Sequence, residues 1–95
     1  MRISFPHTDN PIRRAAPVEL LVIADHKTIR AAIDWSTMEA FLGATPINEE
    51  DVRAFLRNNR ESIEVLISAY LYAHGVPLAR HMVLTRDELE HMPAL

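Results

Sequence analysis

The residues whose types could do chemistry are dispersed along this chain. Zinc sites built on a helix commonly place two histidines four residues apart, on one face. The histidines here fall in separate predicted elements without that spacing, so we predict no metal site. We expect His26 to lie in a turn and His74 to lie near a helix C-terminus, where the helix dipole favours a protonated imidazole. The five are His7, His26, His74, His81 and His91.

Two carboxylates near a predicted strand-to-helix junction, Asp34 and Glu39, have the residue types of a general acid–base pair. A capping role also accounts for Glu39, because Ser36 and Glu39 have the spacing of a capping box. Thr85 is likewise better placed as a helix cap than as a nucleophile. We therefore predict a protein that is not an enzyme and needs no cofactor, with a convergent Asp34–Glu39 pair as the arrangement that would overturn this.

The amino-acid composition excludes further classes of functional site. The chain has no cysteine, which excludes disulfides, thiolate metal sites and cysteine nucleophiles and fits a reducing cytoplasm. Its two glycines, Gly43 and Gly75, stand at predicted helix ends, so there is no glycine-rich phosphate loop. Ten basic and 13 acidic residues give a net charge of −3, which provides no general attraction for nucleic acid.

Arginines on one predicted helix give the strongest argument for nucleic-acid binding. Arg53, Arg57 and Arg60 recur at helical spacing, and Arg13-Arg14 with Arg30 would extend them into a cationic patch. Glutamates four residues away argue against nucleic-acid binding, because they are expected to pair with the arginines. The pairs are Glu49 with Arg53, Arg57 with Glu61, and Arg60 with Glu64. Weak nucleic-acid binding through Arg53, Arg57 and Arg60 remains the alternative function.

Length and pattern predict one α+β domain over residues 1–95. Three prolines restrict residues 1–17 to an edge strand and a loop. Residues 18–35 read as a β-hairpin whose second strand alternates between a core face and a solvent face. No apolar run is long enough for a signal peptide or a membrane span, so we expect a soluble cytoplasmic protein.

Residues 36–75 are predicted as a helical pair. The first helix begins with the Ser36–Glu39 capping box, carries Met38, Phe41 and Leu42 inward and stops at Gly43. The second begins after Asn48, has three acidic residues in its first turn and ends at Gly75. Its apolar positions recur every three or four residues and define the buried face: Val52, Phe55, Leu56, Ile63, Leu66, Ile67, Tyr70 and Leu71.

A last strand within residues 78–84 and a capped turn over residues 85–95 complete the chain. The element order is then three strands, a short helix, a long helix and a strand. That order predicts a two-layer α+β sandwich, in which a small antiparallel sheet, made of the hairpin, the N-terminal edge strand and the C-terminal strand, is covered by the helices.

Several short segments resemble a small bacterial family, the domain of unknown function 1488. They are Ile3-Ser4-Phe5, Ile29 to Trp35, Met38 to Ala44, Phe55 to Ile63 with Asn59-Arg60 before Ile63-Glu64, and Val83-Leu84-Thr85. The resemblance implies a compact α+β domain of the bacterial cytoplasm and carries over no catalytic or ligand-binding residue. The hairpin turn departs from the family, which tends to have Asp-Gly where this chain has Asp25-His26.

Asn59 interrupts the apolar stripe of the long helix. A buried amide must find hydrogen-bond partners or cost about 1–3 kcal/mol. Asn59 either bonds to the backbone within the chain or pairs across a helix–helix contact in a dimer.

Helix length suggests self-association. A helix of about 27 residues is about 40 Å long and overhangs a sheet of short strands. We expect Tyr70, Leu71, Tyr72 and Val76 to lie in the overhang and to form a homodimer contact, unless residues 89–95 fold back over them. The sequence thus favours a protein-interaction or structural module with itself or an unidentified protein as partner.

Overall fold

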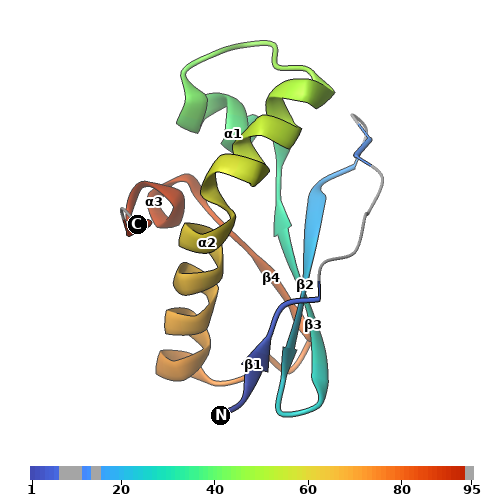
Figure 1. The fold of residues 1–95 in the computed structure, drawn as a ribbon, viewed down its shortest axis with the longest axis vertical. Coiled ribbons are helices and arrows are strands. Elements are labelled where there is room, and N and C mark those ends of the chain that lie inside the picture. The colour runs from blue at the N-terminus through green and yellow to red at the C-terminus, as the bar shows by residue number, and fades with distance from the viewer. Residues whose placement is uncertain (7–11, 14–15, 94–95) are drawn as a thin grey trace.

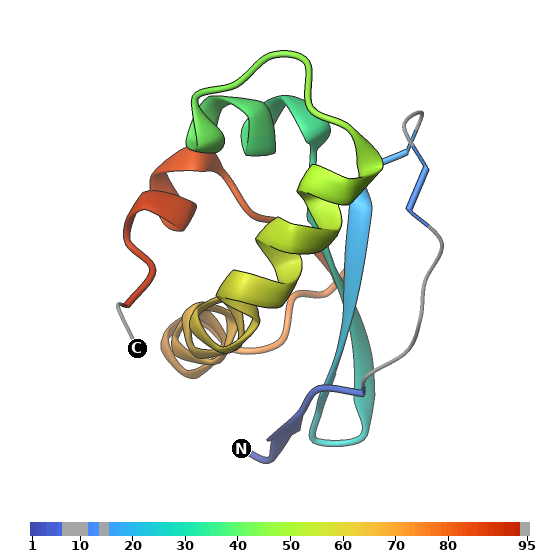
Figure 2. The same ribbon diagram turned by 45° about the horizontal axis from the view of Figure 1, so that its top comes forward.

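The computed structural model describes residues 1–6, 12–13 and 16–93. Four strands form one sheet in the order β1 (Ile3–Ser4), β2 (Val18–Ala24), β3 (Lys27–Ile33) and β4 (His81–Val83). The helices are α1 (Trp35–Leu42), α2 (Glu49–His74) and α3 (Arg86–Glu90). Figures 1 and 2 show the three helices on one side of the sheet, which is the predicted two-layer α+β arrangement.

The hairpin of β2 and β3 is the centre of the sheet. Its strands pair antiparallel over seven residue pairs, from Val18 opposite Ile33 to Ala24 opposite Lys27. Successive side chains of β3 point to opposite faces of the sheet. Ile29, Ala31 and Ile33 are fully buried under the helices, whereas Arg30 on the other face is exposed. β1 pairs antiparallel with the end of β2, as predicted for the edge strand.

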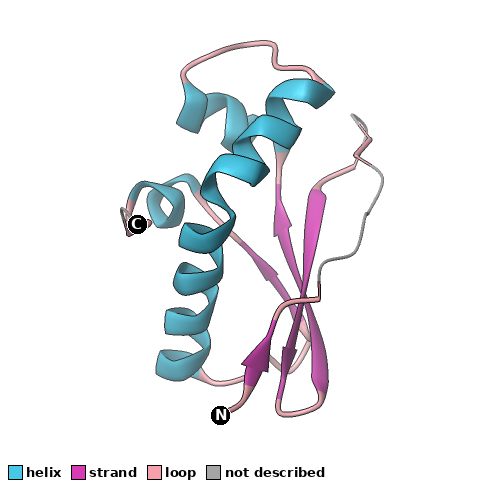
Figure 3. Ribbon diagram, in the orientation of Figure 1, coloured by secondary structure: helices cyan, strands magenta, loops and turns pink. Residues whose placement is uncertain are grey.

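The sheet is mixed and not wholly antiparallel, because β4 runs parallel to β3. The chain leaves β3 at one end of the sheet, and the length of α2 carries it back to the other end before β4 begins, as Figure 3 shows. A long helical crossover of this kind is what parallel neighbours require. The predicted orientation of the last strand was therefore wrong, although its position was correct.

α1 begins earlier than the sequence indicates. Asp34 is extended and precedes the first helical residue, Trp35, so Ser36 already lies within the helix and the predicted Ser36–Glu39 capping box does not form. The Glu39 carboxylate instead accepts the backbone N–H of Ile47, at 3.2 Å. The inward residues are Met38, which is fully buried, and Phe41, whereas Leu42 is exposed, contrary to prediction. Gly43 ends the helix in the left-handed conformation, as predicted.

α2 matches its predicted limits, with Asn48 as cap and Gly75 after the last turn. The Asn48 side chain accepts from Asp51 N–H and the Asp51 carboxylate accepts from Asn48 N–H, both at 2.9 Å. Of the predicted ion pairs on its surface, Glu49–Arg53 and Arg60–Glu64 form, but no Arg57–Glu61 pair is present among the described residues. The predicted capping box at Thr85 likewise forms at the start of α3.

One hydrophobic core lies between the sheet and α2. Val22, Ile29 and Ile33 from the sheet pack with Ile63, Ile67 and other apolar residues of α2. Phe41 of α1 contacts Phe55 of α2 edge to face, with ring centroids 5.5 Å apart. α1 also contacts α3, so the two short helices close one end of the core.

The hairpin turn generates the first prediction. Asp25 and His26 have φ angles of 49° and 67°, and positive φ at both central residues defines a type I′ turn, which favours glycine at the second position. We expect His26→Gly to raise the free energy of unfolding by about 0.5–1 kcal/mol, because glycine has no Cβ to oppose this conformation. Urea denaturation measures the change.

His26→Ala is the matched control. It removes the imidazole but keeps the Cβ, so its midpoint should stay near that of the unmodified protein. Equal midpoints for the Gly and Ala variants would contradict the explanation from backbone conformation.

Candidate functional site

The length of α2 determines where any binding surface can lie. Its 26 residues correspond to about 39 Å, and the molecule as a whole measures 37 Å in its longest dimension. Figures 1 and 2 show that α2 bends partway along, so that it follows the length of the molecule with one side against the core and the other side facing away from the sheet.

The four residues predicted for self-association do not form one surface. Leu71 is fully buried in the core, because its position on α2 points toward the sheet, and it is excluded from any contact between molecules. Val76 is half-buried against the same core. Tyr70 and Tyr72 are 36% and 65% exposed.

The two tyrosines project from different sides of the helix, because residues two apart are separated by about 200°. The Tyr70 ring packs against the His74 imidazole at an angle of 43°, with ring centroids 4.7 Å apart. The Tyr72 hydroxyl donates to the backbone carbonyl of Met1 at 2.9 Å, so the start of the chain reaches the end of α2. Only Tyr72 lies on the side of α2 opposite the core.

That side carries a row of exposed residues, which we call the outward stripe. Its members recur at spacings of three and four and are Asn58, Glu61, Val65, Ala69 and Tyr72. Val65 is 44% exposed, and Glu61 is the one charged member. Solvent-facing sides of helices normally carry many charges, whereas the cores of protein interfaces are depleted of charge. Val65 and Ala69 were not predicted as surface residues, although Val65 is seven residues from both Asn58 and Tyr72 in the sequence.

A groove borders the N-terminal part of this stripe. It encloses about 320 Å³ between the end of α1, the connector after it and the first half of α2. Its lining is mainly apolar, with two carboxamides and one carboxylate: Leu42, Ala44, Ile47, Asp51, Ala54, Phe55, Asn58 and Asn59. The Asn59 amide donates to Phe55 O at 2.9 Å, so its partner lies within the chain. Asn58 belongs to both the groove and the outward stripe.

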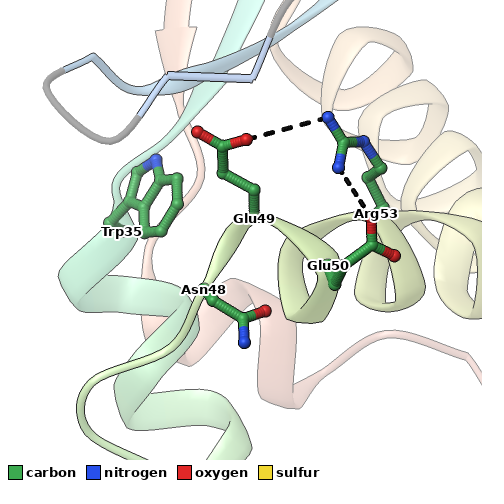
Figure 4. Close-up of a pocket in the computed structure, with 5 residues that line it drawn as sticks. All are labelled: Trp35, Asn48, Glu49, Glu50 and Arg53. Atoms are coloured by element: carbon green, nitrogen blue, oxygen red, sulfur yellow. Dashed lines mark hydrogen bonds and ion pairs between the residues drawn. The ribbon is translucent and has the colours of Figure 1, made fainter.

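A second hollow of about 370 Å³ lies at the start of α2, on another side of the helix (Figure 4). Glu49, Glu50 and Arg53 line it together with Trp35 and Asn48. Arg53 bridges both glutamates, with N–O distances of 3.8 Å to Glu49 and 2.8 Å to Glu50. The Asn48 side chain caps the helix. These polar groups stabilise the first turns of α2 and present no free acid–base pair.

The predicted nucleic-acid-binding residues Arg53, Arg57 and Arg60, which we call the arginine face, have little charge that is not already paired. Arg53 is bound by two glutamates and Arg60 by Glu64 at 2.7 Å, which leaves Arg57 without an ion pair among the described residues. Arg30 lies on the other face of the sheet, where Glu19 approaches it at 3.9 Å, so it does not extend the helix surface. Arg13 is exposed, and Arg14 lies outside the described residues.

The Asp34–Glu39 pair does not converge in the structure. Asp34 is the exposed residue before α1, and Glu39 binds the Ile47 amide. Neither carboxylate lines the two hollows described above. Within residues 1–6, 12–13 and 16–93, no three His, Asp or Glu side chains gather as metal ligands, and His7 lies outside these ranges. In the same part of the chain, no helix combines the length and apolarity of a membrane span.

Comparison with known proteins identifies the fold. No protein-family model matches the sequence, and no curated protein matches it. Among solved structures, the chain is similar to a protein of unknown function of the DUF1488 family from Shewanella loihica PV-4. The TM-score is 0.69 at 14% sequence identity, over 88% of this chain and 92% of the other. The fold is therefore that of a DUF1488-family protein, which confirms the resemblance seen in the sequence at the level of structure.

Leu71 and Tyr72 are neighbours on α2, but the first is buried and the second is exposed, and this difference gives the second prediction. We expect Leu71→Ala to lower the free energy of unfolding by about 2–5 kcal/mol, because it opens a cavity in the core. Tyr72→Ala, one residue away, should cost about 1 kcal/mol or less, since it removes an exposed ring and one surface hydrogen bond. Urea unfolding of the two variants checks the difference, and similar losses would contradict the orientation of α2.

Proposed function

We propose that this protein is a non-enzymatic interaction module that self-associates through the outward stripe of α2. The supporting observation is the nearly uncharged row of exposed residues on a helix that spans the molecule. The absence of cysteine supports a cytoplasmic location for this module.

The composition of the stripe suits a helix-to-helix contact. Val65 and Tyr72 supply apolar area, and Tyr72 adds a hydroxyl that tolerates water at the edge of an interface. Ala69 lies between them and is small enough to let another helix approach closely. Charged residues such as Arg57 stand beside the stripe and provide a polar rim.

The use of the polar side chains supports a non-enzymatic role. Glu39, Asn48 and Asp51 make hydrogen bonds to backbone groups at a connector and at a helix end, and Asn59 bonds to a carbonyl group within its own helix. Catalytic groups, in contrast, face a cavity in which a substrate can reach them. Of the two carboxylates considered as an acid–base pair, Glu39 is engaged in this way.

Sedimentation velocity over a range of protein concentrations tests the proposal. We expect the unmodified protein to approach dimer mass at high concentration. Val65→Lys should weaken the dimer about tenfold or more, because it places a charge in the contact. The new lysine follows Glu61 by four residues, an arrangement that supports the helix, so the fold should be retained.

Val83→Lys is the control, because Val83 is as exposed as Val65, at 45%, but lies on β4 away from α2. This variant should associate like the unmodified protein. A monomer at every concentration would refute the proposal. A salt-sensitive shift in mass on adding short RNA or DNA would instead favour the arginine face.

A further inference from the structure

Charge is distributed unevenly between the two ends of the molecule. Figures 1 and 3 show the start of the chain, the hairpin turn, the end of α2 and the turn before β4 at one end, with α1 and the start of α2 at the other. We call the first of these the basic end, and it comprises residues 1–2, 25–27 and 74–80. It contains three Arg or Lys residues and one carboxylate, that of Asp25. Residues 34–51, at the other end, contain five acidic residues and no Lys or Arg. The net charge of −3 therefore conceals an end of positive charge.

The three basic residues, Arg2, Lys27 and Arg80, are anchored through their main chain. The Asp25 carboxylate accepts the Arg2 N–H, and the Asp25 N–H donates to the Arg2 carbonyl, both at 2.9 Å. The Arg80 carbonyl accepts the N–H of Arg30 in β3 at 3.0 Å, and Lys27 is the first residue of that strand. All three side chains are exposed, and none has an ion pair among the described residues. These charges therefore remain available for an anionic partner.

Two apolar side chains of the basic end are exposed beside these charges. Leu78 lies in the turn before β4, in which the Arg80 N–H bonds to Pro77 O at 3.0 Å. This turn leaves Leu78 fully in solvent, with 104% exposure. Met1, next to Arg2, is 44% exposed. Single exposed apolar residues are common on protein surfaces, but each of these two stands within two residues of an unpaired arginine. The combination suits a partner that offers both negative charge and an apolar phase.

An anionic lipid bilayer has both properties. Its headgroups attract Lys and Arg, and the acyl region beneath them takes up apolar side chains. Nucleic acid would attract the same cations but would leave Leu78 in water, and the basic end has no Phe, Tyr or Trp to stack on bases. The acidic residues at positions 34–51 fit the same partner, because a negative surface repels them and so turns the basic end toward the bilayer.

We propose that the basic end binds the surface of an anionic lipid bilayer, with Leu78 inserted among the headgroups and with Arg2, Lys27 and Arg80 in contact with them. This inference goes beyond the proposed function and uses no residue of the outward stripe. Clusters that bind anionic lipid through charge commonly have about four to eight Lys or Arg residues. Three cations and one inserted leucine therefore give weak, reversible binding that decreases as salt is added.

Cosedimentation with lipid vesicles at low salt tests the proposal. We expect the unmodified protein to bind vesicles of equal parts phosphatidylcholine and phosphatidylserine and to bind phosphatidylcholine vesicles far less. Leu78→Gln should lower the partition coefficient about tenfold, because it removes the inserted apolar group. Lys27→Gln should lower it about fivefold, because it removes one charge at the surface.

Two matched controls make the same changes elsewhere. Leu42→Gln alters a leucine that is 42% exposed at the end of α1, and Arg57→Gln removes an exposed arginine from the middle part of α2. Both variants should bind the vesicles like the unmodified protein. Losses equal to those of Leu78→Gln and Lys27→Gln would contradict the assignment to the basic end.

The other outcomes are also distinct. No binding to the anionic vesicles would overturn this inference, whereas sedimentation without lipid would still decide self-association. A loss with Lys27→Gln but not with Leu78→Gln, together with salt-sensitive binding of short RNA, would overturn the bilayer in favour of nucleic acid.

A fluorescent label provides a second measurement, because the chain has no cysteine of its own. An environment-sensitive dye on Leu78→Cys should shift its emission to shorter wavelength when the anionic vesicles are added, and the same dye on Leu42→Cys should not. An unchanged spectrum at position 78 would overturn the insertion of Leu78.

Discussion

The fold depends on how one long helix is buried by a sheet that is too short for it. α2 is about 39 Å long, whereas the seven-residue strands β2 and β3 extend about 23 Å. The hairpin buries the middle of the helix through residues such as Ile63 and Ile67. The remaining length must be covered by other segments. α1 and the connector after it cover the N-terminal part, where Phe41 meets Phe55, and Met1, before β1, reaches the C-terminal part at Tyr72.

Features that depend on local interactions were predictable from the sequence. Asn48, Gly75 and the Thr85–Glu88 capping box define helix ends within a few residues, and the alternation of β3 defines its buried face. The direction of β4 was not predictable, because it depends on where a helix of 26 residues delivers the chain. The start of α1 was mistaken for a similar reason: Glu39 has a competing partner at Ile47, which folding brings near.

The candidate surface could be predicted only in part. Apolar residues near the end of α2 are apparent in the sequence, but Tyr70, Leu71 and Tyr72 differ by 100° per residue, and a small rotation of the helix decides which one is buried. Leu71 proved to face the core. Leu78 begins the apolar run that predicted the last strand, whereas the turn that precedes β4 leaves it in solvent. Packing, not composition, decides which apolar side chains remain available for a partner.

The parallel pairing of β4 with β3 has a consequence for the order in which the chain folds. Arg30 pairs with His81, 51 residues further along, and closing a segment of that length costs about 3–4 kcal/mol in chain entropy. The strand that repays this cost has three residues and is held to β3 through contacts such as Leu84 N–H to Ala32 O at 2.9 Å. The hairpin and α2 form from neighbouring residues and do not carry that cost. β4 and α3 are therefore expected to join the fold after the hairpin and α2 have formed.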